Sequence, residues 1–527
     1  MGFVWNFPLF TIVLSLFSGV LCTVLSGKKA KIYTMIYEVI LIMMTGAVLS
    51  YTMRTGQSFT YVMGEFPAPW GNEIRAGILE ALMAVSFLVI MLCSVIAGGR
   101  YLKKDLDESR INLYFTLINL MTAALMSIIW TNDIFTGYVF LEILTLTSCG
   151  ILLVREIGRT TLAAMRYMIL NLLGSGLFLL GVVLLYDITG HLLMVNMHQS
   201  IVEIAKEPAH LPVLSIALGI LTIGLAIKSG LFPFHFWMPD TYGRATPTSA
   251  AILSSLVSKA YILLLFKIYY RVVGMEVLKV LPLNRILLIL GMCGIIFGSF
   301  SAIRARNINR MTAFSSAAQI GYIYMGLGIG GIAGYTAAMF HILAHALTKS
   351  QLFLTTPRLA EVSGDRLEFK YMQGSALKCR AAGRTFIISS LSMIGIPILA
   401  GFSSKLLFGV AAVDSGSWRT VIAVMVVLAV SSLLNAMYFI RTMVRIYTDP
   451  EREKTPDDTD GEVVTAKEPG AEQAQEPDAD DEERPYEGQT TGLDYHLPMI
   501  VLTAGNVFLG LFSWVIVDLI QRGLAMF

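Results

Sequence analysis

The sequence predicts an all-α polytopic membrane protein with about fourteen transmembrane helices. Three observations support this prediction. Of the 527 residues, 55% are hydrophobic and only 14% are charged, whereas soluble proteins carry roughly 25% charged residues. Apolar stretches of about twenty residues, long enough to cross a bilayer as helices, recur along the chain. Lysine and arginine gather in alternate loops between these stretches, as expected for loops on one side of a membrane.

The predicted spans share an apolar composition and a length close to that of the bilayer core. They cover residues 8–25, 32–51, 78–98, 111–130, 134–154, 165–187, 211–231, 246–270, 281–303, 314–332, 335–355, 386–412, 420–446 and 497–520. The first lacks a basic n-region and a clear small-residue cleavage site. We therefore interpret it as a membrane helix and not as a signal peptide.

The loops predict which way the helices run. The loops after helices 1, 3, 5, 9 and 11 are basic, and the opposite loops are mostly poor in lysine and arginine. We therefore expect a multi-pass protein of the cell (inner) membrane with both termini outside and the loop between helices 13 and 14 in the cytoplasm. Residues 449–487 of that loop carry sixteen acidic and four basic side chains. This composition predicts a disordered segment that acts as a spacer or, alternatively, as a docking tag.

Lys228 is the most informative residue of the chain. Seventeen uncharged residues precede it, and Pro233 follows five residues later. A charge at bilayer depth costs about 3 kcal/mol on insertion scales and is usually functional, and a proline removes a backbone hydrogen bond from a helix. Transporters build their ion sites from such charges on discontinuous helices. The pairing predicts ion transport and a break in helix 7.

A second lysine beside a helix breaker suggests an internal repeat. Lys405 follows Pro397 in helix 12, five helices after Lys228. An odd offset means that the second unit enters the membrane from the opposite side, which predicts inverted repeats of helices 4–8 and 9–13 with discontinuous helices 7 and 12. The expected organisation is 1–110 for helices 1–3, 111–270 for the first repeat, 271–446 for the second, 447–493 for the acidic disordered cytoplasmic loop and 494–527 for helix 14.

Further ionisable residues are predicted inside the membrane. They are Glu38, Glu142, Lys259, His341, His345 and Lys349. Glu142 could partner the lysines, or it could simply be protonated or hydrogen-bonded. The last three follow one another at i, i+4 spacing on one face of helix 11, which favours a proton relay over a metal site because no carboxylate or cysteine accompanies them. Glu38 is an accessory candidate, for which a lone structural hydrogen bond is an equal alternative.

The chemistry that these residues permit is proton movement. Burial favours the neutral form of a lysine and a nearby carboxylate favours the charged form, so a changing distance between them makes a switchable proton carrier. The chain shows no nucleophile triad, phosphate loop, flavin motif or CxxC pair. We therefore expect no catalytic residue, no cofactor, no metal site and no nucleic-acid partner on this chain.

Two patterns are interpreted as structural. The run Gly326–Gly331 fits GxGxxG, but it lies in an apolar membrane stretch with no preceding strand, so close helix packing is favoured. The aromatic group near helix 7 could bind a quinone, although filling space in an unwound segment, or anchoring at the membrane interface, is the more frequent role. Its members are Phe232, Phe234, Phe236 and Trp237.

The segment KSGLFPFHFWMPDTYGRATPTSAAILSSLVSKAY gives a specific match. It resembles the antiporter-like proton-translocating subunits shared by respiratory complex I, membrane-bound hydrogenases and Mrp-type sodium/proton antiporters. Further matches are TNDIFTGYVFLEILTLTS, INRMTAFSSAAQIGYIYMGLG, HILAHALTKSQLFL and GIPILAGFSSK, which together cover roughly residues 110–445. The segment FPAPWGNEIRAGILEALM looks closer to the Mrp D and hydrogenase branch. Gly77 and Glu80 depart from the usual aspartate and serine pattern, and the long acidic loop is atypical.

The resemblance implies a function and an assembly. It implies that Glu142 pairs with Lys228 and that a hydrated axis continues through Lys259, His345 with Lys349, and Lys405. It also implies other membrane subunits as partners in the bilayer, protons or sodium ions as cargo, and redox chemistry on another chain. We expect a subunit of a redox-driven complex, with a redox-independent Mrp-type antiporter as the alternative and a quinone-binding redox subunit as the least favoured hypothesis.

Overall fold

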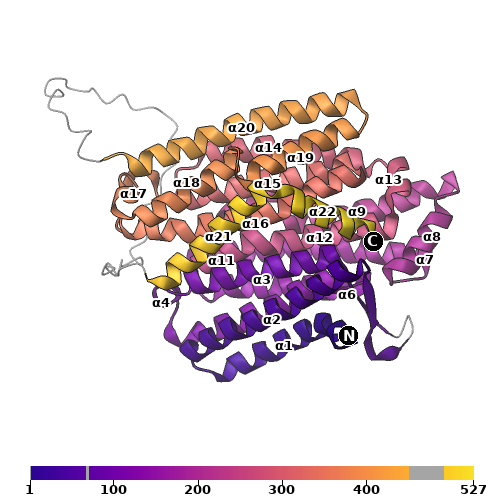
Figure 1. Ribbon diagram of the computed structural model, residues 1–527, viewed down its shortest axis with the longest axis horizontal. Helices are drawn as coiled ribbons and strands as arrows, with labels where there is room; N and C mark the ends of the chain where they lie inside the picture. The colour runs from indigo at the N-terminus through magenta and orange to yellow at the C-terminus, as the bar shows by residue number, and fades with distance from the viewer. Residues whose placement is uncertain (1, 67–70, 450–491, 527) are drawn as a thin grey trace.

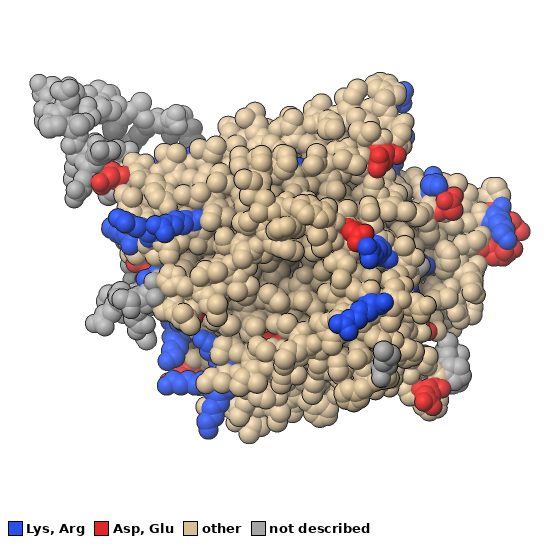
Figure 2. Space-filling model, in the orientation of Figure 1, with Lys and Arg blue, Asp and Glu red and all other residues tan. Residues whose placement is uncertain are grey.

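The computed structural model describes residues 2–66, 71–449 and 492–526. In this part of the chain, long helices lie side by side and run mostly along one direction (Figure 1). On the face shown in Figure 2, charged side chains gather mainly toward the two ends of these helices, and few lie between the ends. The predicted acidic segment 449–487 lies outside the described residues except for Asp449.

The N-terminal helices and the first helical group follow the predicted spans closely. The elements are α1 (Phe7–Val24), α2 (Gly27–Thr55), β1 (Phe59–Val62), β2 (Glu73–Ala76), α3 (Ile78–Gly98), α4 (Leu102–Asp105), α5 (Ile111–Trp130), α6 (Ile134–Leu153), α7 (Gly158–Thr189), α8 (Met194–Ile204), α9 (Leu211–Ser229), α10 (Met238–Arg244), α11 (Pro247–Ile252), α12 (Ser258–Lys267) and α13 (Met275–Val280).

The second helical group and the C-terminal helices complete the described chain. The elements are α14 (Leu283–Arg304), α15 (Ile308–Ile329), α16 (Gly331–Glu361), α17 (Ser375–Lys378), α18 (Arg380–Ile394), α19 (Ala400–Asp414), α20 (Trp418–Tyr447), α21 (Leu493–Leu511) and α22 (Ser513–Ala525). The chain is therefore a mostly helical membrane protein.

One β-hairpin corrects the all-α prediction. β1 pairs with β2 antiparallel, with Phe59 opposite Ala76 and Val62 opposite Glu73. The sequence FTYV of β1 consists of aromatic and β-branched residues, which favour strands, but four residues are too short a run to stand out beside the membrane helices. Trp5 stacks on Phe59 with ring centroids 5.4 Å apart, which fixes the hairpin against the N-terminal end of the chain.

Ten helices of the described chain are long and apolar enough to cross a membrane, or eleven if the pair α21 and α22, bent by 80°, counts as one span. The predicted spans 314–332, 335–355 and 386–412 correspond to α15, α16 and the pair α18–α19. These helices are too polar or too short to be counted among the ten. α15 and α16 are buried along most of their length. Protein surrounds their polar side chains, so these helices need no apolar exterior.

Both predicted helix breaks are present. α9 ends at Ser229, Gly230 takes the left-handed conformation with φ +78°, and a short 3₁₀ turn leads into α10. α18 ends at Ile394, Gly395 has φ +95°, and α19 begins five residues later. Only glycine adopts such backbone angles without steric cost, so a glycine ends each first half-helix.

Glycines allow α14 and α15 to pack closely together. α14 packs along α15, where a Cβ atom on Gly291 would lie 2.5 Å from the backbone nitrogen of Met325. A Cβ on Gly328 would lie 2.2 Å from the backbone nitrogen of Leu288. The second glycine belongs to the GxGxxG pattern, so the helix-packing interpretation of that pattern agrees with the structure.

Candidate functional site

Lys228 lies in the last turn of α9, directly before the first helix break, and is completely buried. Its Nζ donates a hydrogen bond of 2.6 Å to Thr145 Oγ1 of α6. It also lies 5.4 Å from the centroid of the Tyr261 ring of α12. Gly174 of α7 leaves room for the lysine stem, because a Cβ there would lie 3.1 Å from Lys228 Cγ. Four helices thus position one ammonium group.

Glu142 precedes Thr145 by one turn of the same helix. It is half-buried, and its Oε1 is buried without a hydrogen-bond partner in the described chain. Among the described residues, no ion pair within 4.0 Å joins Glu142 to Lys228. Glu142 and Thr145, the threonine that holds the lysine, are separated along α6 by a rise of about 4.5 Å. The conformation seen here is therefore one in which the implied pair is open.

Lys259 sits at the start of α12, behind a π-helical turn that the sequence did not reveal. This turn spans Leu253–Val257 and joins α11 to α12. Lys259 Nζ donates to the carbonyl oxygen of Ser254, inside the π turn, and to Ser258 Oγ at 3.2 Å. Single π turns inside α-helices are frequent at functional sites. The lysine is completely buried and reaches a carbonyl group of this turn.

α16 carries the two histidines and the third lysine on one face. The rings of His341 and His345 lie 5.9 Å apart and are nearly parallel, at 17°. Nδ1 of His341 is 2.6 Å from Ser404 Oγ of α19. Lys349 donates to the carbonyl oxygen of Thr312 at 2.9 Å and to the side chain of Ser315. This face of α16 therefore contacts both α19 and α15.

Lys405 follows the second helix break and is half-buried. Its Nζ donates to the carbonyl oxygen of Ile394 at 2.6 Å and to Ser432 Oγ of α20 at 2.8 Å. Ile394 is the last residue of α18, whose C-terminal carbonyl groups form the negative end of the helix dipole. Such an end stabilises a cation. The break therefore provides a binding place for the ammonium group.

Contacts between helices join these groups into one row, called here the Lys228 row. Thr145 Oγ1 lies 3.2 Å from the Tyr261 hydroxyl, two residues after Lys259. The π turn packs against α16, which packs against α19. The Tyr322 ring lies 5.3 Å from the His341 ring and 5.9 Å from Lys405 Nζ. The row comprises Glu142, Lys228, Lys259, His341, His345, Lys349 and Lys405.

The structure places the other predicted residues elsewhere. Pro233 and Pro397 lie in the two helix breaks. Glu38 lies apart from the Lys228 row, between α2 and α5, where its Oε1 is 3.0 Å from Thr122 Oγ1. In the aromatic segment, Phe232 stacks on Phe297 with ring centroids 4.8 Å apart and Trp237 donates to the carbonyl oxygen of Ile227 at 3.3 Å, whereas Phe236 is 59% exposed. The contacts of Phe232 and Trp237 agree with the space-filling interpretation.

Several residues of the site were not predicted from the sequence. Thr145, Tyr261, Tyr322 and Ser404 hold or connect the ionisable groups, but nothing in their sequence context separates them from other polar residues of membrane helices. Lys267 was also missed. It is fully buried and donates to the carbonyl oxygens of Ile129 at 2.5 Å and Thr131 at 2.8 Å, at the end of α5. Lys267 lies near the end of a predicted span, where a lysine usually extends its ammonium group to the membrane surface, so its sequence position does not indicate burial.

The charge balance of the Lys228 row limits what it can do. It contains four lysines and two histidines but one carboxylate, and all except Glu142 and Lys405 are completely or almost completely buried. Burying several like charges close together is strongly unfavourable, so most of these groups must be neutral at any moment. Such a row can pass a proton from group to group. Across the described residues, no set of three or more His, Cys, Asp or Glu side chains could hold a metal ion.

Comparison with known proteins identifies the family. The profile of the NADH:quinone oxidoreductase/Mrp antiporter transmembrane family matches residues 131–431. The chain belongs to this family. The match contains the whole Lys228 row, whereas Glu38 and the helices α1 to α3 precede it. The family and the fold together make the chain an antiporter-like, multi-pass membrane subunit.

Relatives within the family come from two kinds of complex. NADH-quinone oxidoreductase subunit N of Desulforudis audaxviator is 33% identical over 407 residues, which are 77% of this chain and 79% of the relative. A Na(+)/H(+) antiporter subunit of Bacillus subtilis is 24% identical over 451 residues, which are 85% of this chain and 88% of the relative.

Solved structures share the fold. A chain of the archaeal membrane-bound sulfane sulfur reductase has a TM-score of 0.81 at 22% identity, covering 100% of this chain and 97% of that chain. A chain of the Mrp complex from Dietzia sp. has a TM-score of 0.83 at 23% identity with the same coverage.

Proposed function

We propose that this chain moves protons across the cell (inner) membrane as a subunit of a multi-subunit, redox-driven complex of the complex I or membrane-bound hydrogenase type. The observation that carries the proposal is the Lys228 row, in which ionisable groups come from five packed helices, with polar contacts from Lys228 through Thr145 to Tyr261 and from His341 to Ser404. The roles assigned to Glu142, Lys228, Lys259, His345 with Lys349, and Lys405 are those that the family resemblance implies.

Proton transfer along the Lys228 row would depend on Lys228 changing its partner between Thr145 and Glu142. With Lys228 held by Thr145, Glu142 makes no direct ion pair with the ammonium group, so the carboxylate favours the charged lysine less than it would in contact. With Lys228 against Glu142, the opposite charge favours the protonated lysine. Thr145 and Glu142 lie three residues, about one helical turn, apart on α6. The helix break directly after Lys228 would let the last turn of α9 move between these two partners.

The fourteen-helix architecture is part of the proposal. α15, α16 and the broken pairs α18–α19 and α21–α22 would cross the membrane in addition to the ten apolar helices. Residues 111–270 and 271–446 would form the two inverted repeats, each with one broken helix. The breaks after Lys228 and before Lys405 support this assignment, because they fall in the seventh and twelfth predicted helices.

The basic loops support the proposed orientation. Both termini would lie outside, and the acidic loop would lie in the cytoplasm. Other membrane subunits would cover apolar helix faces of this chain, and the redox cofactors would reside on partner subunits, as the multi-subunit complexes among the structural neighbours suggest.

A redox-independent Mrp-type Na⁺/H⁺ antiporter is the second candidate. The structural similarity to the Mrp complex from Dietzia sp. supports it, at a TM-score of 0.83. So does the 28% identity to the putative antiporter subunit mnhD2 of Staphylococcus haemolyticus. In that case the same row would exchange protons for sodium driven by ion gradients alone.

Transport by the purified complex in vesicles tests both candidates. Proton movement that starts on addition of an electron donor, without a sodium gradient, supports the redox-driven complex. Proton movement that starts only on imposing a sodium gradient supports the Mrp-type antiporter. Lys228→Ala must strongly reduce either activity, and Lys206→Ala serves as the control because that side chain is 64% exposed. Unchanged transport in Lys228→Ala contradicts the function proposed for the row.

A further inference from the structure

A second buried polar row, called here the Glu38 row, lies between α1, α2 and α5. α1 contributes polar side chains at a spacing of three and four residues, which places them on one helix face. α2 and α5 contribute the facing partners. The described members are Thr11, Ser15, Ser18, Cys22, Tyr33, Thr34, Tyr37, Glu38, Asn119, Thr122 and Trp130.

Hydrogen bonds cross between the helices along this row. Trp130 Nε1 donates to Thr11 Oγ1 at 3.2 Å, and the Tyr37 hydroxyl donates to Ser15 Oγ at 3.1 Å. Further along, Asn119 Nδ2 donates to the Cys22 sulfur at 3.1 Å. Ser18 Oγ and the Tyr33 hydroxyl lie 3.1 Å apart. The row therefore extends along much of α1.

Glu38 is the one carboxylate in the middle of this helix group. It is completely buried, about 16 Å along α2 from its first residue. α1 and α5 contain no charged residue, and the other charged residues of α2, α3 and the turn before α5 lie at the helix ends. These are Lys28, Lys29, Lys31, Glu108 and Arg110 at one end, and Arg54 and Glu80 at the other.

The other titratable groups of the Glu38 row are weak acids and not cations. They are Tyr33 and Tyr37 of α2 and Cys22 of α1. Among the described residues, Glu38 makes no ion pair within 4.0 Å, and its Oε2 has no hydrogen-bond partner. A buried carboxylate without a counter-ion is strongly unfavourable. The group must therefore be neutralised, and a proton does this without requiring further space.

The contact with Thr122 supports a proton on Glu38. Thr122 Oγ1 lies 3.0 Å from Glu38 Oε1 and 3.1 Å from the carbonyl oxygen of Ile118. A threonine hydroxyl has one proton and can satisfy one of these acceptors. If Glu38 carries a proton on Oε1, the acid donates to Thr122 Oγ1 and the threonine donates to Ile118. Both contacts are then hydrogen bonds.

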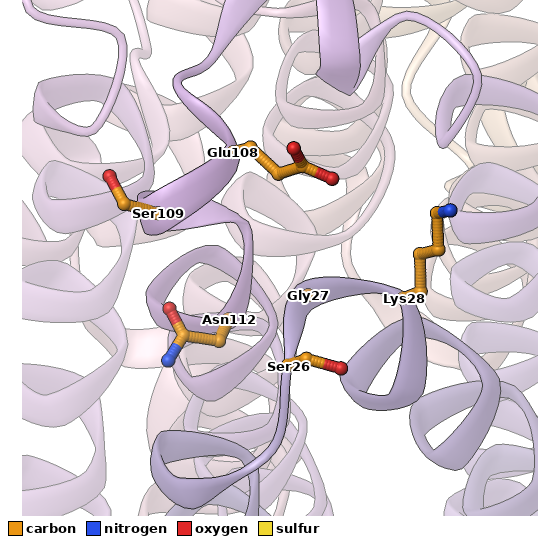
Figure 3. Close-up of a pocket in the computed structure, with 6 residues that line it drawn as sticks. All are labelled: Ser26, Gly27, Lys28, Glu108, Ser109 and Asn112. Carbon is orange, nitrogen blue, oxygen red and sulfur yellow. The ribbon is translucent and has the colours of Figure 1, made fainter.

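Hollows in the surface lie at both ends of the Glu38 row. A cavity of about 520 Å³ lies where α1 passes into α2 and α5 begins, and its lining includes Ser26, Lys28, Glu108 and Asn112 (Figure 3). A second cavity of about 250 Å³ lies at the opposite end of α2, between Trp5, Tyr51 and Phe59. Cys22 and Thr34 are near the first cavity along the chain, and Thr11 is near the second. Water in either cavity could deliver or accept a proton.

We propose that Glu38 is a second proton-binding site, separate from the Lys228 row, which exchanges its proton with solvent through the hydroxyl groups of the Glu38 row. Protonation adds one proton to the Glu38 carboxylate, and release returns that proton to water in one of the two cavities. The site lies in helices that precede the residues matched by the family. It does not depend on the function proposed for the Lys228 row.

Infrared difference spectroscopy of the purified full complex tests this proposal. The spectra should contain the carbonyl band of a protonated carboxylic acid that shifts when H₂O is replaced by D₂O. This band should be lost in Glu38→Gln and kept in Glu276→Gln, a control whose carboxylate is 85% exposed. Thr122→Val should move the band, because it removes the hydroxyl group that contacts the acid.

Three outcomes would overturn the proposal. They are the absence of a band that depends on Glu38, a band that does not exchange in D₂O, and a band that sodium removes at constant pH, which would indicate a sodium-occupied carboxylate. The variant Lys228→Ala separates this test from that of the proposed function. It should keep the Glu38 band even though transport through the Lys228 row is lost.

Discussion

Lys228 Nζ donates to Thr145 Oγ1 at 2.6 Å and makes no ion pair with Glu142, one helical turn earlier on α6. The lysine thus has two candidate partners on one helix, one neutral and one acidic. The neutral partner is occupied in this conformation.

Lys228→Ala should reduce proton transport by about a hundredfold, the loss expected when a proton-transfer group is removed. The complex should still assemble, because alanine is apolar and, within the described part of the chain, the lysine makes no ion pair that its removal would leave broken. Vesicle transport and the amount of intact complex are the two measurements. Substantial transport in a fully assembled Lys228→Ala complex would contradict the relay.

Thr145→Val should reduce transport by about tenfold to a hundredfold, because a hydrogen bond to a charged group contributes about 1.5 to 3 kcal/mol. Valine has nearly the shape of threonine, so packing should persist. Thr147→Val is the matched control on the same helix, since the Thr147 hydroxyl donates to the carbonyl oxygen of Ile143 at 2.8 Å. Equal transport rates in the two variants would show that Thr145 is not a partner in the switch.

Gly395→Ala should reduce transport, because it disturbs the position of Lys405. The substitution places a Cβ atom 3.0 Å from Lys405 Cδ and 3.2 Å from its Nζ. It also forces alanine to φ +95°, at a cost of about 1 to 2 kcal/mol.

Gly416→Ala carries a similar backbone cost, at φ +68°, but its Cβ meets open space. Both variants should therefore lower the thermal stability of the complex, and transport should fall only in Gly395→Ala. A parallel loss of transport in both would attribute the effect to backbone strain.

Ser404→Ala should slow transport several-fold, in keeping with the loss of one hydrogen bond of about 1 kcal/mol. The serine hydroxyl lies 2.6 Å from Nδ1 of His341 and orients that ring. Ser403→Ala is the neighbouring control, because the Ser403 hydroxyl donates to the carbonyl oxygen of Gly510 at 3.0 Å. If Ser403→Ala slows transport as much as Ser404→Ala, the role of the histidine contact is refuted.

Helix location was largely predictable from the sequence. Each predicted span coincides with helical residues, and the breaks beside Lys228 and Lys405 fall where glycine and proline indicate them. The helices α15 and α16 are not among the ten helices apolar enough to cross a membrane by composition. They are buried inside the protein, so their side chains need not be apolar. The β-hairpin and the π turn before Lys259 left no clear sequence pattern.

The ionisable groups of the site were predictable from the sequence, but the hydroxyl groups that contact them were not. Lysine, histidine and glutamate stand out in an apolar helix because a buried charge is unfavourable there. Thr145, Tyr261 and Tyr322 do not stand out, since hydroxyl groups are common in membrane helices and bond to their own backbone. Which of them meets a lysine depends on how separate helices are rotated against one another.

Hydropathy, proline and glycine act locally along the chain, so the sequence alone predicts a helical membrane protein with charges and helix breaks at defined positions. Which charges share a row depends on the folded structure. It brought Lys228 to Thr145 and separated Glu38 into another helix group, since side-chain contacts between helices depend on packing over long sequence separations.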